Sequence, residues 1–211
     1  MGRNLGFVRD DALEAAMRVF WEKGYEGASL DCLTLAMGIN RPSLYRTFGN
    51  KDRLFRLAMR RYEITKLGFA WRALRMPTAL GVCESFLSGF IALILDPAVP
   101  DGLLGIHGAI ACSSVAEPIR DLLNHRREIY IYALKRRLRE ARRDGDLGVD
   151  VDPSHFARYI VAIVGALSLQ GKAGDGRAQL DSTAYFALYA LRQAGAEETG
   201  CHDVPLSNAV G

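Results

Sequence analysis

Residues 38–51 read GINRPSLYRTFGNK, a pattern that predicts a tight turn followed by a short polar helix. Gly38 readily adopts the left-handed backbone of such a turn, and Asn40 is a favoured N-cap residue. A proline suits the first helical turn, where its missing amide hydrogen would have no partner in any case. Leu44 and Phe48 lie four residues apart, so they share one helix face and can anchor it to a core. The opposite face is then left to solvent or to a partner.

A second short helix is predicted just before this turn. Ser29 can cap it, and Leu30, Leu33 and Met37 recur at a spacing that places them on one side. Two short helices around a glycine turn are typical of helix-turn-helix DNA-binding units. Lys51 is placed for an additional contact with a DNA backbone. The side chains of the second helix that can hydrogen-bond base edges or phosphates are Arg41, Ser43, Tyr45, Arg46 and Thr47. From spacing alone, a solvated basic face stays open as the alternative.

The remaining sequence also has helical periodicity, without the alternation that marks a strand. A capping box at Asp11 and Glu14 predicts the start of the first helix, and Gly24 its end. Asp152 and Pro153 mark another helix start. We expect an all-α protein of about nine helices. The further helices are expected over about residues 51–75, 78–95, 103–116, 118–143, 153–171 and 177–194.

The composition fits a globular protein. The 211 residues are 49% hydrophobic and 24% charged, which suits one domain or a small head joined to a larger body. The longest apolar runs, 86–95 and 159–169, are shorter than the roughly 20 residues that span a bilayer. The N-terminus leads into no signal-peptide core, and the four cysteines lie far apart without zinc-site spacing. We therefore expect a cytoplasmic, nucleoid-associated protein with no metal, cofactor or membrane partner.

A net charge of +3 hides two basic segments. Residues 41–61 carry seven Lys or Arg and one acidic residue, and residues 120–143 carry nine and three. The first segment contains the predicted recognition helix, which agrees with a polyanionic partner. The second segment fits the solvated face of one amphipathic helix, with a membrane-surface or second nucleic-acid patch as the alternative.

The N-terminal third resembles the DNA-binding head of the TetR family of bacterial transcriptional regulators. The resemblance covers about residues 8–62 and is especially close over residues 38–51. Thr34 and Met37 stand where the family commonly has alanine, which bears on how the two short helices cross. The matching patterns are FxxxGY at 20–25, SL at 29–30, GI at 38–39 and LYxxFxxKxxLF at 44–55.

The resemblance implies a regulator rather than an enzyme. It implies a homodimer that binds a palindromic double-stranded operator and, as a repressor, releases it when a small-molecule effector binds the body. Tyr45, Lys51 and Ser29 would hold phosphates. The residues that would face the major groove are Arg41, Pro42, Ser43 and Arg46. The full set of residues expected at the DNA is Ser29, Asn40, Arg41, Pro42, Ser43, Tyr45, Arg46, Thr47 and Lys51.

The expected organisation is a head over residues 1–50, a linking helix over 51–75, a body for effector binding and dimerisation over 76–195, and a flexible tail over 196–211. An apolar body favours a hydrophobic or aromatic effector. The candidate pocket residues are Trp71, Phe86, Phe90, His107, Cys112, Tyr130 and Tyr159. The candidate dimer-interface residues are Phe156, Ala162, Ile163, Ala166, Leu167, Ala184, Ala187, Leu188 and Leu191. For both sets, packing inside a single chain is the alternative.

Two rival functions remain. A helical enzyme finds no support, since the sequence contains no catalytic or phosphate-binding motif. A thiol-based redox regulator of the same fold would use Cys112 or Cys83. Neither cysteine is flanked by Lys, Arg or His, which would lower the pKa of its thiol.

Overall fold

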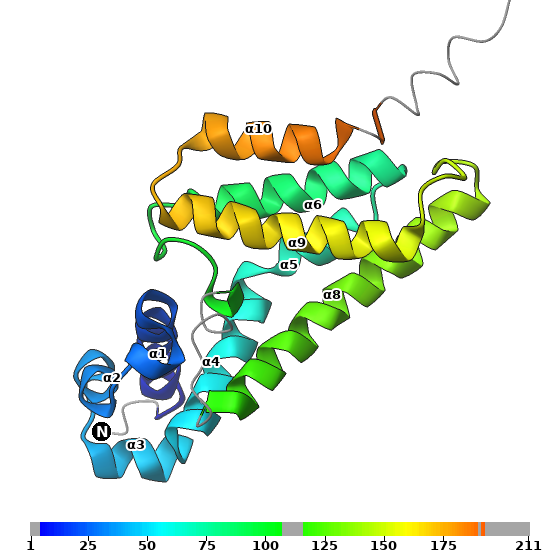
Figure 1. Cartoon of the computed structure of the whole chain (residues 1–211). Coiled ribbons are helices and arrows are strands. Elements are labelled where there is room, and N and C mark those ends of the chain that lie inside the picture. Colours follow the sequence, from blue (N-terminus) through cyan, green and yellow to red (C-terminus); the bar gives the residue numbers. More distant parts are fainter. Residues whose placement is uncertain (1–4, 107–115, 190, 193–211) are drawn as a thin grey trace, which may run out of the picture.

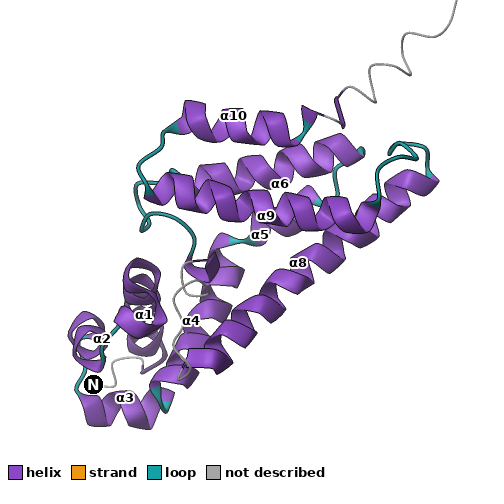
Figure 2. Ribbon diagram, viewed as in Figure 1, coloured by secondary structure: helices purple, strands orange, loops and turns teal. Residues whose placement is uncertain are grey.

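The computed structural model describes residues 5–106, 116–189, 191 and 192, with side chains from residue 9 onward. This part of the chain is largely helical and contains no strand, which confirms the predicted all-α class (Figure 1, Figure 2). Residues 104–106 are helical, and most of the helix predicted over 103–116 lies outside the described residues. None of the described helices is long and apolar enough to cross a membrane. The helices are α1 (Leu5–Gly27), α2 (Leu30–Met37), α3 (Arg41–Phe48), α4 (Lys51–Lys66), α5 (Gly68–Ala73), α6 (Ala79–Ile94), α8 (Glu117–Arg143), α9 (Pro153–Lys172) and α10 (Arg177–Ala187).

Both N-caps predicted in the head, Ser29 and Asn40, are confirmed, and Asn50 caps α4 in the same way. The side chains of Ser29, Asn40 and Asn50 each accept a hydrogen bond from the backbone amide three residues later, at 3.1, 2.8 and 2.8 Å. Gly38 has a φ of 63° and a ψ of 30°, the left-handed conformation expected between α2 and α3. Each cap supplies an acceptor for an amide that a helix start leaves unpaired.

Helices α1 to α4 form the head, at the lower left of Figure 1. Aromatic rings fill its core: Phe20 meets Phe55 edge-on with ring centroids 5.0 Å apart, and Trp21 meets Tyr62 edge-on at 4.7 Å. Tyr62 and Phe55 both belong to α4, so α1 packs against the buried face of α4.

The first helix begins earlier than predicted. It starts at Leu5, and Asp11 lies inside it, so the capping-box prediction is wrong. Residues 5–10 contain no proline, and they continue the helix toward the N-terminus. Gly24 has non-helical angles, a φ of 69° and a ψ of 179°, so the regular part of α1 ends there as predicted.

The linking helix expected over residues 51–75 is two helices. It breaks at Leu67, which has a φ of −102° and a ψ of 11°. The Leu67 side chain is buried in the core, and the chain redirects there so that α5 packs against α6. The last helix, predicted over 177–194, is interrupted: α10 ends at Ala187 because Leu188 leaves the helical conformation, and residues 189, 191 and 192 are helical again.

The body consists of α5, α6 and α8 to α10. In Figure 1, α8 runs diagonally from beside the head to the far end of the body, and α6, α9 and α10 lie above it. Two hydrogen bonds join α1 to the loop that follows α6. Arg18 Nη1 donates to the Ala98 carbonyl at 2.8 Å, and Trp21 Nε1 donates to the Gly102 carbonyl at 3.0 Å. The head is thereby docked on the body from α1 as well as through α4.

Candidate DNA-binding surface and body cavity

Helix α3 has one buried face and one polar, exposed face. Leu44 and Phe48 are almost completely buried and fix the helix to the head. Tyr45, Arg46 and Thr47 point away from this core, and Tyr45 keeps 50% of its surface exposed. The polar side of the predicted recognition helix is therefore free to contact a partner.

Two of the predicted contact residues already have partners on the surface. Arg41 Nη2 lies 2.7 Å from Asp31 Oδ1, and both side chains are more than half exposed. Arg46 Nη2 lies 3.5 Å from Ser43 Oγ. Exposed pairs of this kind contribute little to stability, so these arginines can exchange their partners for phosphates or base edges at small cost.

Lys51 is held in place at the start of α4. Its Nζ lies 4.6 Å from the centroid of the Tyr25 ring, which attracts a cation through the negative face of the ring. Burial lowers the pKa of Lys51 below its ordinary value, and the nearby carboxylate of Glu26 opposes this effect. The ammonium group is thus positioned beside the α3–α4 turn rather than swinging freely in solvent.

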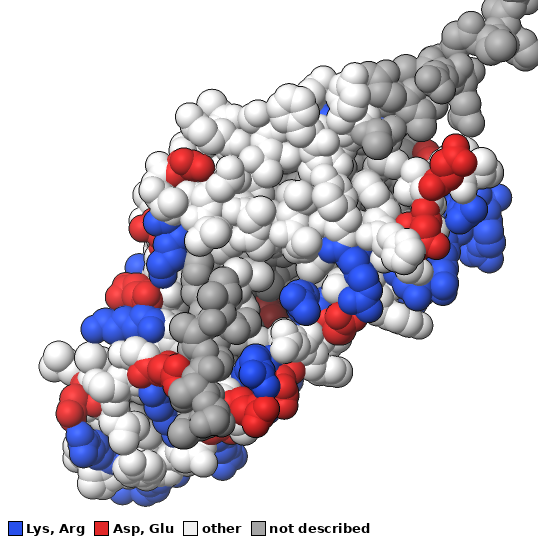
Figure 3. Space-filling model, in the orientation of Figure 1, with Lys and Arg blue, Asp and Glu red and all other residues white. Residues whose placement is uncertain are grey.

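One basic residue at this surface was not predicted. The Arg9 guanidinium lies 5.8 Å from the centroid of the Phe48 ring, so α1 adds a cation next to α3. Arg9 was not predicted at this surface because the expected start of the first helix, at Asp11, lies after it. Figure 3 shows basic side chains at the tip of the head, at the lower left of the molecule.

Thr34 and Met37 leave the packing of α2 intact. Met37 is buried, and the Thr34 hydroxyl donates to the Leu30 carbonyl of its own helix at 2.9 Å. Both positions are therefore satisfied within the two-helix unit.

This head matches a known DNA-binding family. Residues 12–58 match the model of bacterial regulatory proteins, tetR family. Over 177 residues the chain is 30% identical to the HTH-type transcriptional repressor ComR of Escherichia coli strain K12. The matched region covers 82% of this chain and 83% of ComR. The chain belongs to the TetR family. It is thus a DNA-binding transcriptional regulator and not an enzyme.

Other TetR-family similarities extend through the body. The chain is 33% identical to the uncharacterized HTH-type transcriptional regulator YezE of Bacillus subtilis strain 168, over 76% of this chain and 84% of YezE. It superposes on CifR, a TetR-family regulator solved with a 26-base-pair double-stranded operator DNA, with a TM-score of 0.84 and 36% identity. That superposition covers 90% of this chain and 99% of the CifR chain.

The body of this TetR-family protein contains a cavity of about 80 Å³ between α4, α6, α8 and α9. Three of the predicted pocket residues line it, Phe86, Phe90 and Tyr130. Trp71 and Tyr159 do not line it, and each is more than two-fifths exposed at the surface. The remaining predicted pocket residues, His107 and Cys112, lie outside the described residues.

The charged residues that line the cavity were not predicted from the sequence. The solvated face predicted for residues 120–143 would include Arg126, but Arg126 Nη1 lies 3.2 Å from Glu63 Oε2 at the cavity wall. The spacing along α8 could have indicated this inward position, because residue 126 falls between the inward-facing Leu123 and Tyr130. Burial raises the pKa of Glu63, and the adjacent Arg126 opposes that rise. Burial also raises the pKa of Tyr130, to about 12.

The predicted dimer-interface residues fall into two groups. Four of them are buried within the protomer, which favours the alternative of packing inside a single chain: Leu167, Ala187, Leu188 and Leu191. Their side chains fill the space between α9, α10 and α6. The other five are exposed or partly exposed on α9 and α10: Phe156, Ala162, Ile163, Ala166 and Ala184.

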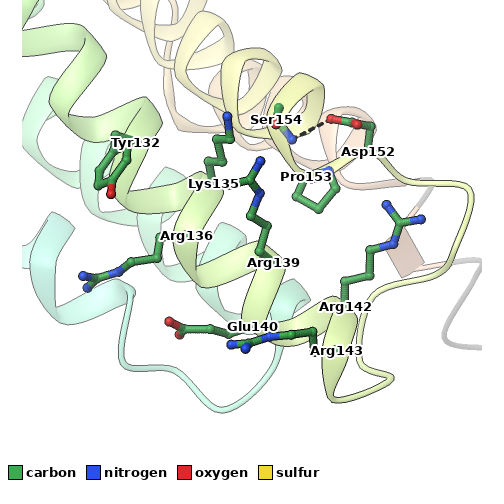
Figure 4. A pocket seen from close by; sticks show the side chains of 10 residues that line it. All are labelled: Tyr132, Lys135, Arg136, Arg139, Glu140, Arg142, Arg143, Asp152, Pro153 and Ser154. Atoms are coloured by element: carbon green, nitrogen blue, oxygen red, sulfur yellow. Dashed lines mark hydrogen bonds between the residues drawn. The ribbon is translucent and has the colours of Figure 1, made fainter.

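The second basic segment forms the outer face of α8. Arg136, Arg139 and Arg143 are exposed there, as a solvated face predicts. They line an open hollow of about 640 Å³ together with the start of α9, where Asp152 caps the Ser154 amide at 2.7 Å (Figure 4). This hollow lies at the end of the body far from the head (Figure 1).

Cys83 does not have the properties of a redox-sensing thiol. Its side chain is completely buried in α6, and burial raises the pKa of the thiol to about 12. The reactive thiolate is therefore disfavoured at this position. Cys112, the other candidate, lies outside the described residues.

Proposed function

We propose that this protein is a transcriptional repressor that binds a palindromic operator as a homodimer and releases it when a small molecule occupies the body cavity. The exposed polar face of α3, held by the buried Leu44 and Phe48, is the observation that carries this proposal. The similarity to ComR, a repressor, supports the direction of regulation.

The proposed DNA contacts follow the exposed face of the head. Tyr45 and Lys51 bind phosphates on either side of the α3–α4 turn, and Arg46 reaches a base edge in the major groove. Ser29 binds a phosphate at the start of α2, where exposed amides favour an anion. The other proposed contacts are Asn40, Arg41, Pro42, Ser43 and Thr47, all of them exposed or partly exposed.

The proposed dimer interface is the outer face of α9 and α10. Tyr159 and Leu169 on α9 are 43% and 59% exposed, and Phe186 on α10 is 69% exposed. Large apolar side chains gathered on one surface favour association with a partner. Ala162 and Ala166 lie between them on α9 and allow two helices to approach closely. Two heads related by a twofold axis would read two half-sites spaced about one helical turn apart.

Selection of bound sequences from random double-stranded DNA tests this proposal. The expected product is an inverted repeat, bound at one dimer per site in light scattering of the complex. The variants Leu169→Glu and Phe186→Glu should shift the free protein to monomer and weaken operator binding. Asymmetric selected sites, or a monomer of wild-type protein on the operator, would contradict the proposal.

A further inference from the structure

The cavity in the body has apolar walls and one polar end. Phe86 and Phe90 of α6 and Val164 of α9 form part of the apolar wall. Glu63 of α4 and Arg126 of α8 meet at the polar end, with Glu63 Oε2 3.2 Å from Arg126 Nη1. The pair joins α4 of the head to α8, the longest described helix of the body.

Two buried hydrogen-bond donors of residues that line the cavity lack an acceptor among the described residues. The Tyr62 side chain is 2% exposed; the backbone amide of Leu104 lies toward its hydroxyl oxygen, and no described residue accepts a hydrogen bond from the hydroxyl proton. Arg126 Nε is likewise buried without a partner. A buried donor without an acceptor is unfavourable, so both groups favour a ligand that brings an oxygen acceptor.

The geometry of Arg126 narrows the kind of acceptor. Glu63 lies at Nη1, which leaves the guanidinium edge formed by Nε and Nη2, and among the described residues Nε on this edge has no hydrogen-bond partner. That edge presents two parallel N–H groups, which match the two oxygens of a carboxylate. Arg127 also lines the cavity and adds a second positive charge against the single negative charge of Glu63.

We propose that this cavity binds a small apolar carboxylate. The carboxylate pairs with the Nε–Nη2 edge of Arg126 and accepts from the Tyr62 hydroxyl, while the apolar end contacts Phe86, Phe90 and Val164. The link from this binding to DNA release rests on the function proposed above.

The size of the cavity connects binding to movement. Its volume of about 80 Å³ is below the ~150 Å³ of a cavity that accommodates benzene, so a ligand of that size either extends through the open side of the cavity or displaces its walls. The bound carboxylate also shares Arg126 with Glu63, and the two like charges repel each other. The repulsion, together with any displacement of the walls, loosens the contact between α4 and α8, and α4 belongs to the head.

Titration calorimetry on the full-length protein tests the site. The probes are butanoate, hexanoate, benzoate and phenylacetate, each compared with its neutral primary amide. At least one carboxylate should bind at least tenfold more tightly than its amide, since a hydrogen bond to a charged group exceeds a neutral one. Equal binding of acid and amide, or no binding of any of the four carboxylates at about 10 mM, would overturn the proposal.

Three variants separate recognition from folding. Arg126→Gln should weaken carboxylate binding at least tenfold, whereas Glu63→Gln should tighten it about fivefold, because it removes the like charge and keeps the shape. Effects of opposite sign are not expected from a general loss of structure. The double variant Glu63→Gln with Arg126→Gln leaves no unpaired buried charge and should still fail to discriminate acid from amide. Arg136→Gln, on the outer face of α8, is the matched control and should bind as wild type. Unchanged carboxylate binding in Arg126→Gln would refute the site.

Operator binding is measured separately, by fluorescence anisotropy with the selected DNA. If a carboxylate binds with this variant pattern and the DNA complex persists, the binding site is supported and effector-driven release is refuted. If the protein binds no selected DNA at all, the proposed function fails while the calorimetric result still decides the site.

Discussion

Lys51→Met tests the proposed division of DNA contacts most directly. The Lys51 ammonium lies 4.6 Å from the centroid of the Tyr25 ring and is the cation at the first residue of α4. Methionine keeps an unbranched stem that can still pack on Tyr25, and it removes only the charge. The variant should therefore fold normally and lose one phosphate contact in each protomer.

The size of the effect follows from counterion release. Each neutralised phosphate of B-DNA contributes about −0.9 to the slope of log K against log salt concentration. A symmetric dimer has two copies of Lys51, so the slope should become less steep by about 1.8. Between 50 and 200 mM salt, a fourfold change, wild type should therefore lose about twelvefold more affinity than the variant.

The assay is operator binding by fluorescence anisotropy across this salt range, on both the selected operator and a scrambled duplex. Lys51→Met should weaken both complexes, because a phosphate contact carries no sequence information. Tyr45→Phe should weaken binding without changing the slope, since it removes a hydroxyl and no charge. Arg136→Met makes the same charge change on the far end of α8 and should leave the slope unaltered. A Lys51→Met slope equal to that of wild type, or a slope change of the same size in Arg136→Met, would refute the reasoning.

Three further predictions concern stability and reactivity. Asn40→Ala removes the N-cap of α3 and should lower the free energy of unfolding by about 1 kcal/mol, seen as a lower midpoint in urea at unchanged m-value; no shift would show that the cap is dispensable. Gly89→Ala should destabilise the body by about 1–3 kcal/mol in the same assay, although alanine favours helices, because the added Cβ would overlap the Phe69 ring; a more stable variant would contradict this packing. Cys83 should resist iodoacetamide at pH 8 in the folded protein, because burial raises the pKa of its thiol, whereas Cys32, with its lowered thiol pKa, should react; peptide mapping that finds Cys83 labelled first would overturn the argument.

Local features of the head could be predicted from sequence because their causes lie within a few residues. A cap needs a short polar side chain and an amide three residues later, and Ser29, Asn40 and Asn50 all meet this requirement. The turn between α2 and α3 needs a positive φ, which Gly38 provides without strain. Helical periodicity was likewise sufficient for the all-α class, although not for the break between α4 and α5.

Arrangements that depend on distant residues could not be predicted in the same way. Leu67 interrupts an otherwise continuous helical pattern because its side chain is buried in the core between head and body, which no local signal records. From the sequence, Leu167 and Leu188 are equally suited to a dimer interface and to the core of one protomer, because an apolar side chain can be buried in either. The packing of α9 and α10 on α6 buries both residues within the protomer.

Arg126, at the proposed ligand site, has one property that the local sequence predicts and one that depends on a distant residue. Its position on the inward stripe of α8 is visible in the sequence, but its partner Glu63 lies 63 residues away along the chain. The spacing of side chains along a helix is a property of the chain itself. Which charge, ring or helix meets them depends on how helices distant in sequence pack, and that packing brings α4 against α8 and creates the cavity.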